Sequence, residues 1–303
     1  MPIKPARFIV LTLIACAAIA DTPPPDGNAA LNTITVEAAR HRELVEQQVK
    51  TFVSHIAQKP YGSSLARWES VVPLCPLVAG LPREDGEFIL ARVSQIAASA
   101  GAPLAAERCK PNFFIVVSAD PDALLKAWNK RDVWMFGDEG PGKIRKFIGS
   151  KSPIRVWYNA ELYSDEGTPM GNGDGTSNYS ANSIRANLRA RATRIVFNDT
   201  RDLTSALVMV DGPRARGINF GQLAAFIALT GLAEIRADAQ ATDAPTILHL
   251  FSAVENDRPA GLSAWDAAFL KALYRTDHAD RQQLQEIKSA MVQAIVPSGK
   301  AAP

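Results

Sequence analysis

A short apolar run near the N-terminus decides which part of this 303-residue chain is left to fold. Lys4 and Arg7 precede the run, which covers residues 8–15, and small residues and a proline-rich stretch follow it. The run is too short to span a bilayer, and this order of basic, apolar and small residues is typical of an export signal. We therefore expect residues 1–20 to be a signal peptide and the rest of the chain to fold in an oxidising compartment.

Two processing sites compete within this signal. Residues 18–20 read Ala-Ile-Ala, a pattern at which signal peptides are cleaved, and cleavage there releases a soluble chain that begins at Asp21. Residues 13–16 read Leu-Ile-Ala-Cys, which resembles a bacterial lipobox and implies lipidation of Cys16. Both routes stay open, so we expect an exported protein that is either periplasmic or an outer-membrane lipoprotein. A lipid anchor on Cys16 is the only membrane attachment we expect.

The composition is that of a globular protein, with 47% apolar and 21% charged residues. Residues 1–20 contain two basic residues and no acidic one, so the expected mature chain has 31 basic and 31 acidic residues. Binding to nucleic acid rests on a clustered excess of Lys and Arg, and the chain as a whole has no such excess. We therefore expect no nucleic-acid partner.

Beyond the signal, the chain holds two cysteines, Cys75 and Cys109. Each lies beside proline in a predicted loop, and the two loops flank one predicted helix, residues 83–100. Because thiols of exported proteins pair in oxidising compartments, we expect these two cysteines to form a disulfide bond. Closing a loop of about 35 residues stabilises the fold by about 3–4 kcal/mol in the chain-entropy model.

Hydrophobic periodicity predicts an α+β fold with two lobes. Residues 21–33 lack any period and are expected to be a linker. Residues 34–136 form the first predicted lobe and residues 153–297 the second. The glycine-rich, basic residues 137–152 mark the boundary between the lobes.

Each predicted lobe combines strands and helices. The elements expected in the first lobe are strands at residues 34–36 and 113–118 and helices at 40–57, 83–100 and 121–128, with caps at Gly101 and Asp120. The second is expected to contain a hairpin of residues 194–197 and 203–210, an apolar helix at 219–230 ending near Gly231, an extended segment at 245–251, a helix capped by Ser263 and a last helix at 281–295. Residues 164–182 are almost free of apolar side chains and are expected to form a long exposed loop.

No catalytic or metal-binding motif stands out. The four histidines, His41, His55, His249 and His278, are too far apart in sequence to share one helical face as a zinc pair, and no Gly-x-Ser-x-Gly elbow occurs. We therefore expect no metal and no cofactor. The catalytic residues, if the chain is an enzyme, are not assigned, and the absence of a motif favours a protein that is not an enzyme.

The order of elements in residues 194–276 carries a resemblance. A strand precedes a helix reading Gly-Gln-Leu-Ala-Ala, and the segments PTILHLF and LSAWDAAFLKALY follow. This order resembles the catalytic half of zincin-type metalloproteases, in which a strand precedes an H-E-x-x-H helix. Gly221, Gln222 and Ala225 occupy the places of the two histidines and the glutamate, so the resemblance implies a degenerate zincin-like fold without zinc or a general base.

The expected mature chain as a whole resembles an uncharacterised family of exported bacterial proteins. The resemblance rests on the segments CPLVAGLP, CKPNFFIVV and GQLAAFIALTGLAEI. It implies export and brings no known activity.

These observations favour a non-catalytic binding or scaffolding module of the cell envelope, whose partner is an envelope polymer or protein. The alternative is an envelope hydrolase that acts through carboxylates on a polymer or peptide, with residues 164–182 as a lid. A third hypothesis is a module that binds a sugar or another small ligand through exposed aromatic residues, for which the candidates are Trp128, Trp134, Trp157 and Tyr158.

Overall fold

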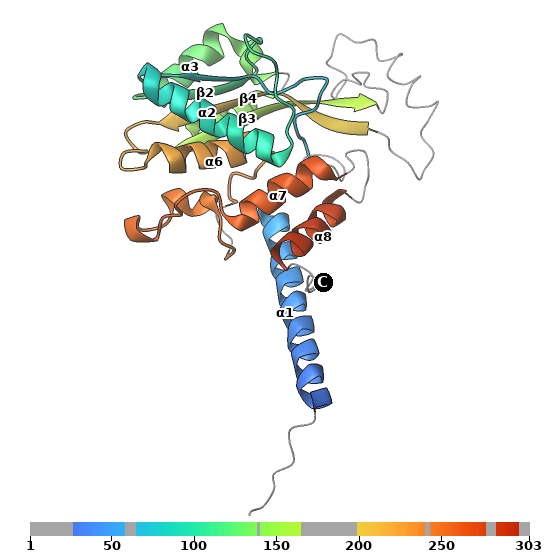
Figure 1. Cartoon of the computed structure of the whole chain (residues 1–303). Helices are drawn as coiled ribbons and strands as arrows, with labels where there is room; N and C mark the ends of the chain where they lie inside the picture. Colours follow the sequence, from blue (N-terminus) through green and yellow to red (C-terminus); the bar gives the residue numbers. More distant parts are fainter. Residues whose placement is uncertain are drawn as a thin grey trace, which may run out of the picture. The chain divides into compact units, whose positions relative to one another are not determined.

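The computed structural model of the chain (Figure 1) describes residues 27–57, 65–137, 140–164, 199–239, 243–276 and 283–296. The chain divides into two compact units, Met1–His41 and Arg42–Pro303, and the division falls within helix α1 (Gly27–Ile56). The predicted signal peptide, with Cys16, lies outside the described residues.

Helix α1 corrects two expectations for the start of the chain. Residues 27–33 of the predicted linker and the predicted strand at residues 34–36 both belong to this helix. Residues 37–50 are rich in Ala, Glu, Gln, Arg and Leu, which favour helix. Because adding a residue to an existing helix costs far less than starting one, the helix extends back through the β-branched residues at 33–36.

A four-stranded sheet organises the second unit. Its strands are β1 (Pro76–Ala79), β2 (Phe113–Ser118), β3 (Ile154–Ser164) and β4 (Asp199–Asp211), in the order β1-β2-β4-β3. Strands β1, β2 and β4 run parallel, and β3 pairs antiparallel with β4 at the edge of the sheet. With helices packed on this mixed sheet, the predicted α+β class is confirmed.

The sheet joins the two predicted lobes into one body. Strand β2 comes from residues 34–136 and β4 from residues 153–297, yet they pair directly, from Phe113 opposite Ala206 to Ser118 opposite Asp211. The prediction of two separate lobes is therefore wrong. The supposed boundary at residues 137–152 contains helix α4 (Pro141–Gly149), whose apolar side chains are buried. Its glycines and its single proline resemble those of a linker, but Pro141 sits at a helix start, where proline is tolerated.

Helices cover both faces of the sheet (Figure 1). The larger core lies on the face that receives Phe113, Ile115 and Val208, and there the sheet packs against α2 (Arg83–Ala100), α6 (Phe220–Leu232), α7 (Ala264–Arg275), α8 (Gln283–Ile295) and the last turns of α1. The smaller core lies on the opposite face, around Trp157 and Met209, beneath α3 (Pro121–Arg131), the 3-10 turn η1 (Val133–Phe136) and α4. None of the described helices is both long enough and apolar enough to cross a membrane.

The C-terminal end of α6 is held by three aromatic side chains. The Tyr158 hydroxyl, the Trp68 Nε1 group and the Tyr274 hydroxyl donate hydrogen bonds to the carbonyl oxygens of residues 230, 231 and 232, at 2.6, 2.8 and 2.6 Å. The last carbonyls of a helix have no partner within the helix, and buried ones need donors from elsewhere. These three bonds supply them.

Gly231 has a different role from the one its position in the sequence predicts. It lies inside α6 rather than beyond its end, and a Cβ atom there would be 2.1 Å from the Phe113 ring. The residue is glycine because the aromatic ring of β2 packs directly on the helix backbone.

Three predicted caps are confirmed. Gly101 ends α2 with a positive φ of 92°, Asp120 accepts a hydrogen bond from the Ala123 amide at the start of α3, and Ser263 forms a capping box with Asp266 at the start of α7.

Two local predictions in the second half are wrong. Residues 199–202, expected to be a turn, belong to β4, because Arg201 pairs there with the buried Glu234 and Asp202 is itself buried. Residues 194–198 of the expected hairpin lie outside the described residues. The expected extended segment 245–251 contains a 3-10 turn, η2 (Ile247–Phe251), whose start is fixed because the Asp266 carboxylate accepts hydrogen bonds from the Thr246 hydroxyl and the Ile247 amide. A second short turn, η3 (Glu255–Asp257), follows η2.

Candidate functional site

A cavity of about 340 Å³ follows the outer edge of β3. Residues 154–158 of this strand all line it. Because successive side chains of a strand point to opposite faces of the sheet, a cavity that touches five consecutive residues lies along the strand's edge. The cavity therefore straddles the open side of the sheet.

The two walls of the cavity differ in chemistry. On the side of the smaller core, α4 and the residue after it contribute Lys143, Lys146, Phe147 and Ser150, beside the indole of Trp157. On the side of the larger core, the wall is mainly apolar and consists of Phe226, Thr230, Ile235, Ala237, Ala239 and Leu248, with Arg236 at 46% side-chain exposure.

The cavity has a marked charge. Four cationic residues line it, Lys143, Lys146, Arg155 and Arg236, and none of the lining residues that the structure describes is acidic. Asp238, which does not line the cavity, binds Arg236 at 2.8 Å. The ammonium nitrogen of Lys143 lies 5.2 Å from the centroid of the Trp157 ring, within the range of a cation–π interaction. The concentration of cationic side chains in the lining favours an anionic ligand.

Arg155 brings a buried cation to the cavity from within β3. Its side chain is 3% exposed, and it binds Asp122 at 2.5 Å and donates to the carbonyl oxygen of Ile148 at 2.9 Å. Hydrogen bonds from Lys151 and Arg155 lower the pKa of the Asp122 carboxyl to about 2. The Nε group of Arg155 is buried, and it has no hydrogen-bond partner within the described part of the chain. A buried donor without a partner is a place for a water oxygen or another acceptor.

The backbone of β3 also directs amide and carbonyl groups toward the cavity. The Asp211 amide donates to the carbonyl oxygen of Pro153 at 2.9 Å. Pairs in an antiparallel ladder alternate, so residues 155 and 157 also direct their amide and carbonyl groups toward β4. Residues 154, 156 and 158 therefore direct theirs outward, along the cavity, where no described strand pairs with β3.

Tyr158 is a structural part of this wall. Its hydroxyl donates to the Thr230 carbonyl oxygen at 2.6 Å and accepts from the Ile235 amide at 3.2 Å. Burial raises the pKa of the phenol well above its usual value. The side chain therefore joins β3 to the end of α6 rather than exchanging a proton.

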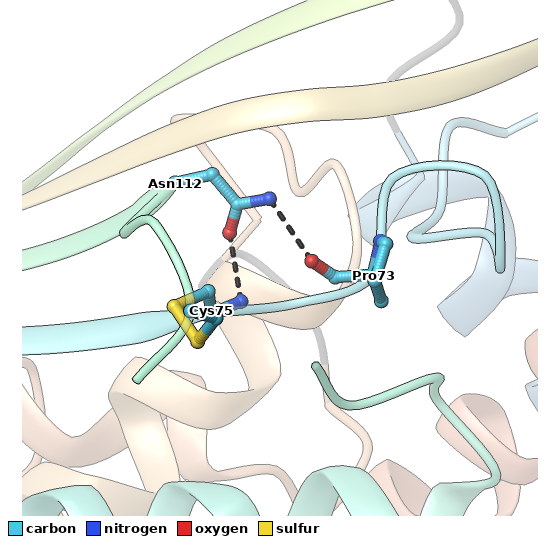
Figure 2. Close-up of a disulfide and its surroundings, with 4 residues drawn as sticks. Pro73, Cys75 and Asn112 are labelled. Carbon is cyan, nitrogen blue, oxygen red and sulfur yellow. Dashed lines mark hydrogen bonds between the residues drawn. A yellow bond between two sulfur atoms is a disulfide. The ribbon is translucent and has the colours of Figure 1, made fainter. Parts of the chain in front are cut away.

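The structure pairs the two predicted cysteines. Cys75 precedes β1 and Cys109 precedes β2, and a disulfide joins them with 6.1 Å between the Cα atoms. Figure 2 shows Asn112 beside the bond: its side chain accepts from the Cys75 amide at 2.8 Å and donates to the Pro73 carbonyl oxygen at 3.0 Å. Since β1 and β3 are the two outer strands, the disulfide lies at the opposite edge of the sheet from the cavity.

The residues at the places of the zincin ligands have structural contacts. Gln222 completes the N-terminal capping box of α6 and donates to the Pro259 carbonyl oxygen at 2.8 Å. Gly221 and Ala225 lie in the same helix. Within the described residues, no group of three or more His, Cys, Asp or Glu side chains is arranged to hold a metal ion. The absence of zinc stays a prediction, and His278 lies outside the described residues.

Two of the four aromatic residues named from the sequence line the cavity, Trp157 and Tyr158. Trp128 packs against the smaller core instead, and the side chain of Trp134 lies outside the described part. Sequence reasoning missed Lys143 and Lys146. The available signal was in residues 141–149, where buried apolar residues alternate with basic ones at helical spacing.

Comparison with the models of known protein families, with curated proteins and with solved structures finds no match for this chain.

Proposed function

We propose that this protein is a non-catalytic binding protein of the cell envelope, and that its ligand is an anion with an apolar body held in the cavity along β3. The observation that carries the proposal is the lining, in which four cationic side chains and no described acidic one surround a largely apolar space. Its volume of about 340 Å³ lies within the range of small-molecule sites.

The lining gives no support to the alternative of a carboxylate-dependent hydrolase. Such an enzyme needs two acidic side chains that converge on the bond to be cleaved. The nearby carboxylates of Asp122 and Asp238 are held by arginines and lie outside the lining.

Placement in the envelope rests on the sequence and on the cysteines. The export signal of residues 1–20 and a disulfide between Cys75 and Cys109 support an oxidising compartment. Mass spectrometry of the mature N-terminus tests this part. A free Asp21 or an acylated Cys16 is the expected result, and a mature form that retains Met1 contradicts export.

The binding proposal is tested with anilinonaphthalene sulfonate, an anionic aromatic dye that fluoresces in apolar sites. We expect the dye to bind the wild-type protein and decanoate to displace it. Decyltrimethylammonium has the same apolar chain with the opposite charge, and it should displace the dye poorly. Equal displacement by both compounds contradicts an anion site.

A pair of variants on α4 locates the dye. Lys146→Glu reverses a charge in the cavity lining, whereas Arg145→Glu makes the same change on an exposed neighbour outside it. We expect Lys146→Glu to weaken dye binding by about tenfold and Arg145→Glu to leave it nearly unchanged. An equal effect of both variants places the dye elsewhere.

A further inference from the structure

We propose that the ligand is an extended peptide that adds to the sheet beside β3 and alternates acidic and apolar side chains. The acidic side chains face α4, and the apolar ones face α6. This inference rests on the proposed function, because it names the ligand class for the same cavity.

The free edge of β3 supplies the main-chain partners. Ser152 Oγ donates to the outward carbonyl oxygen of Ile154 at 2.6 Å. The free edge therefore begins at Val156, the next residue whose amide and carbonyl groups point outward. The outward amide and carbonyl groups of Val156 and Tyr158 have no partner strand within the described chain. Unpaired groups of this kind on an edge strand are the template for an added strand.

The two walls supply the side-chain pattern. An added strand directs alternate side chains to opposite faces of the sheet. On one face they meet Lys143 and Lys146 of α4, and on the other they meet the apolar surface of Phe226 and Leu248. A peptide with acidic residues at every second position and apolar residues between them satisfies both walls.

A second copy of this chain fits the edge less well. Two copies that pair through β3 around a two-fold axis bring the same flanks together. Lys143 and Lys146 of one copy then lie along the same edge as those of the other, and the like charges repel. An acidic partner removes this repulsion.

The test uses fluorescence anisotropy of the full mature chain with a labelled eight-residue peptide of alternating valine and glutamate. We expect saturable binding of this peptide. The same peptide with lysine in place of glutamate should bind at least about tenfold more weakly. Equal binding of the two peptides overturns the inference.

Backbone methylation separates strand addition from simple charge attraction. One peptide carries N-methyl groups on its valines and a second carries them on its glutamates. In an added strand, only one of these two sets of amides faces β3. One peptide should therefore bind at least about tenfold more weakly than the other. Two methylated peptides with the same affinity show that the β3 edge is not used, and they overturn the inference.

Variants of the protein complete the test. Val156→Pro removes an outward amide at a place where edge strands tolerate proline, and it should lower the affinity for the peptide. Lys146→Glu should weaken it, and Arg145→Glu should not. If Val156→Pro does not fold, as judged by circular dichroism, the methylated peptides decide alone.

The outcomes distinguish this inference from the proposed function. If the dye binds in a Lys146-dependent way and the peptide does not bind, strand addition is overturned and the anion site stands. If neither binds, both fall. A dimer that sedimentation detects without peptide, and that Val156→Pro abolishes, shows that the β3 edge serves self-association. This result overturns the inference of a peptide ligand.

Discussion

The carboxylate of Asp122, in the first turn of α3, holds the buried guanidinium of Arg155 across the smaller core, with 2.5 Å between oxygen and nitrogen. Lys151 binds the other oxygen of the same carboxylate at 2.9 Å. The pair joins a helix that covers the sheet to the strand that lines the cavity. Because these hydrogen bonds lower the pKa of the Asp122 carboxyl in the fold, the stability of the protein depends on pH.

Asp122→Asn should destabilise the protein at neutral pH and not at strongly acidic pH. The pKa of this carboxyl is about 2 in the fold against 3.8 ordinarily, so its stabilising effect is present above about pH 4 and is lost as the pH falls towards 2. For a partly exposed carboxylate we expect a loss of about 1 kcal/mol at pH 7. Urea unfolding of the wild type and the variant between pH 7 and pH 2 measures this difference in the free energy of unfolding. A difference that stays constant over this range contradicts the assignment.

Tyr158→Phe should lower the free energy of unfolding by about 1–2 kcal/mol, because it leaves the Thr230 carbonyl and the Ile235 amide without their buried partner. Tyr163→Phe is the control, since the hydroxyl of Tyr163 bonds to Glu161 within its own strand. We expect the control to change stability by less than about 0.5 kcal/mol. Urea denaturation compares the two, and equal losses contradict a special role for Tyr158.

Gly231→Ala should lower the free energy of unfolding by about 2–3 kcal/mol, because the added methyl group overlaps the buried ring of Phe113. Gly142→Ala is the matched control. Gly142 lies in α4 with open space around its Cα, so alanine there should be neutral or should stabilise the helix by up to about 1 kcal/mol. Thermal unfolding of both variants is the measurement. A neutral Gly231→Ala shows that α6 and β2 do not approach as closely as described.

Loss of the disulfide should lower stability by about 3–4 kcal/mol in the chain-entropy model. The test compares the wild type with a double variant, Cys75→Ala with Cys109→Ala, in the presence and absence of dithiothreitol. Reduction should bring the wild type to the stability of the double variant and should leave the double variant unchanged. A wild type that is insensitive to the reductant while its thiols become titratable contradicts a stabilising bond.

The sequence predicts correctly the features that depend on a few neighbouring residues. Asp120 and Ser263 cap helices because their side chains reach amides three residues away, and Gly101 ends a helix because it adopts a positive φ. The pairing of Cys75 with Cys109 follows from elimination, since the two cysteines beyond the expected signal peptide have one way to pair.

Features that depend on distant partners are not predicted. The pairing of β2 with β4 joins residues almost a hundred positions apart, and no local pattern in either strand indicates the other. Arg201 and Asp202 are polar and therefore predict a turn from sequence alone. Their burial depends on residues far away along the chain, such as Glu234, and the local sequence does not indicate it. The cavity has the same origin, since its lining comes from α4, β3, α6 and the residues that follow α6.

The three aromatic donors at the end of α6 also bear on the order of folding. Trp68, Tyr158 and Tyr274 lie 163, 72 and 42 residues from the carbonyl groups that they bind. The helix end is therefore complete only after segments from the beginning, middle and end of the sheet-containing unit have all assembled. Contacts so far apart in sequence slow folding and make it cooperative. In a chain that is synthesised from its N-terminus, the carbonyl oxygen of Leu232 therefore receives its hydrogen bond only after Tyr274 has been made and has folded back.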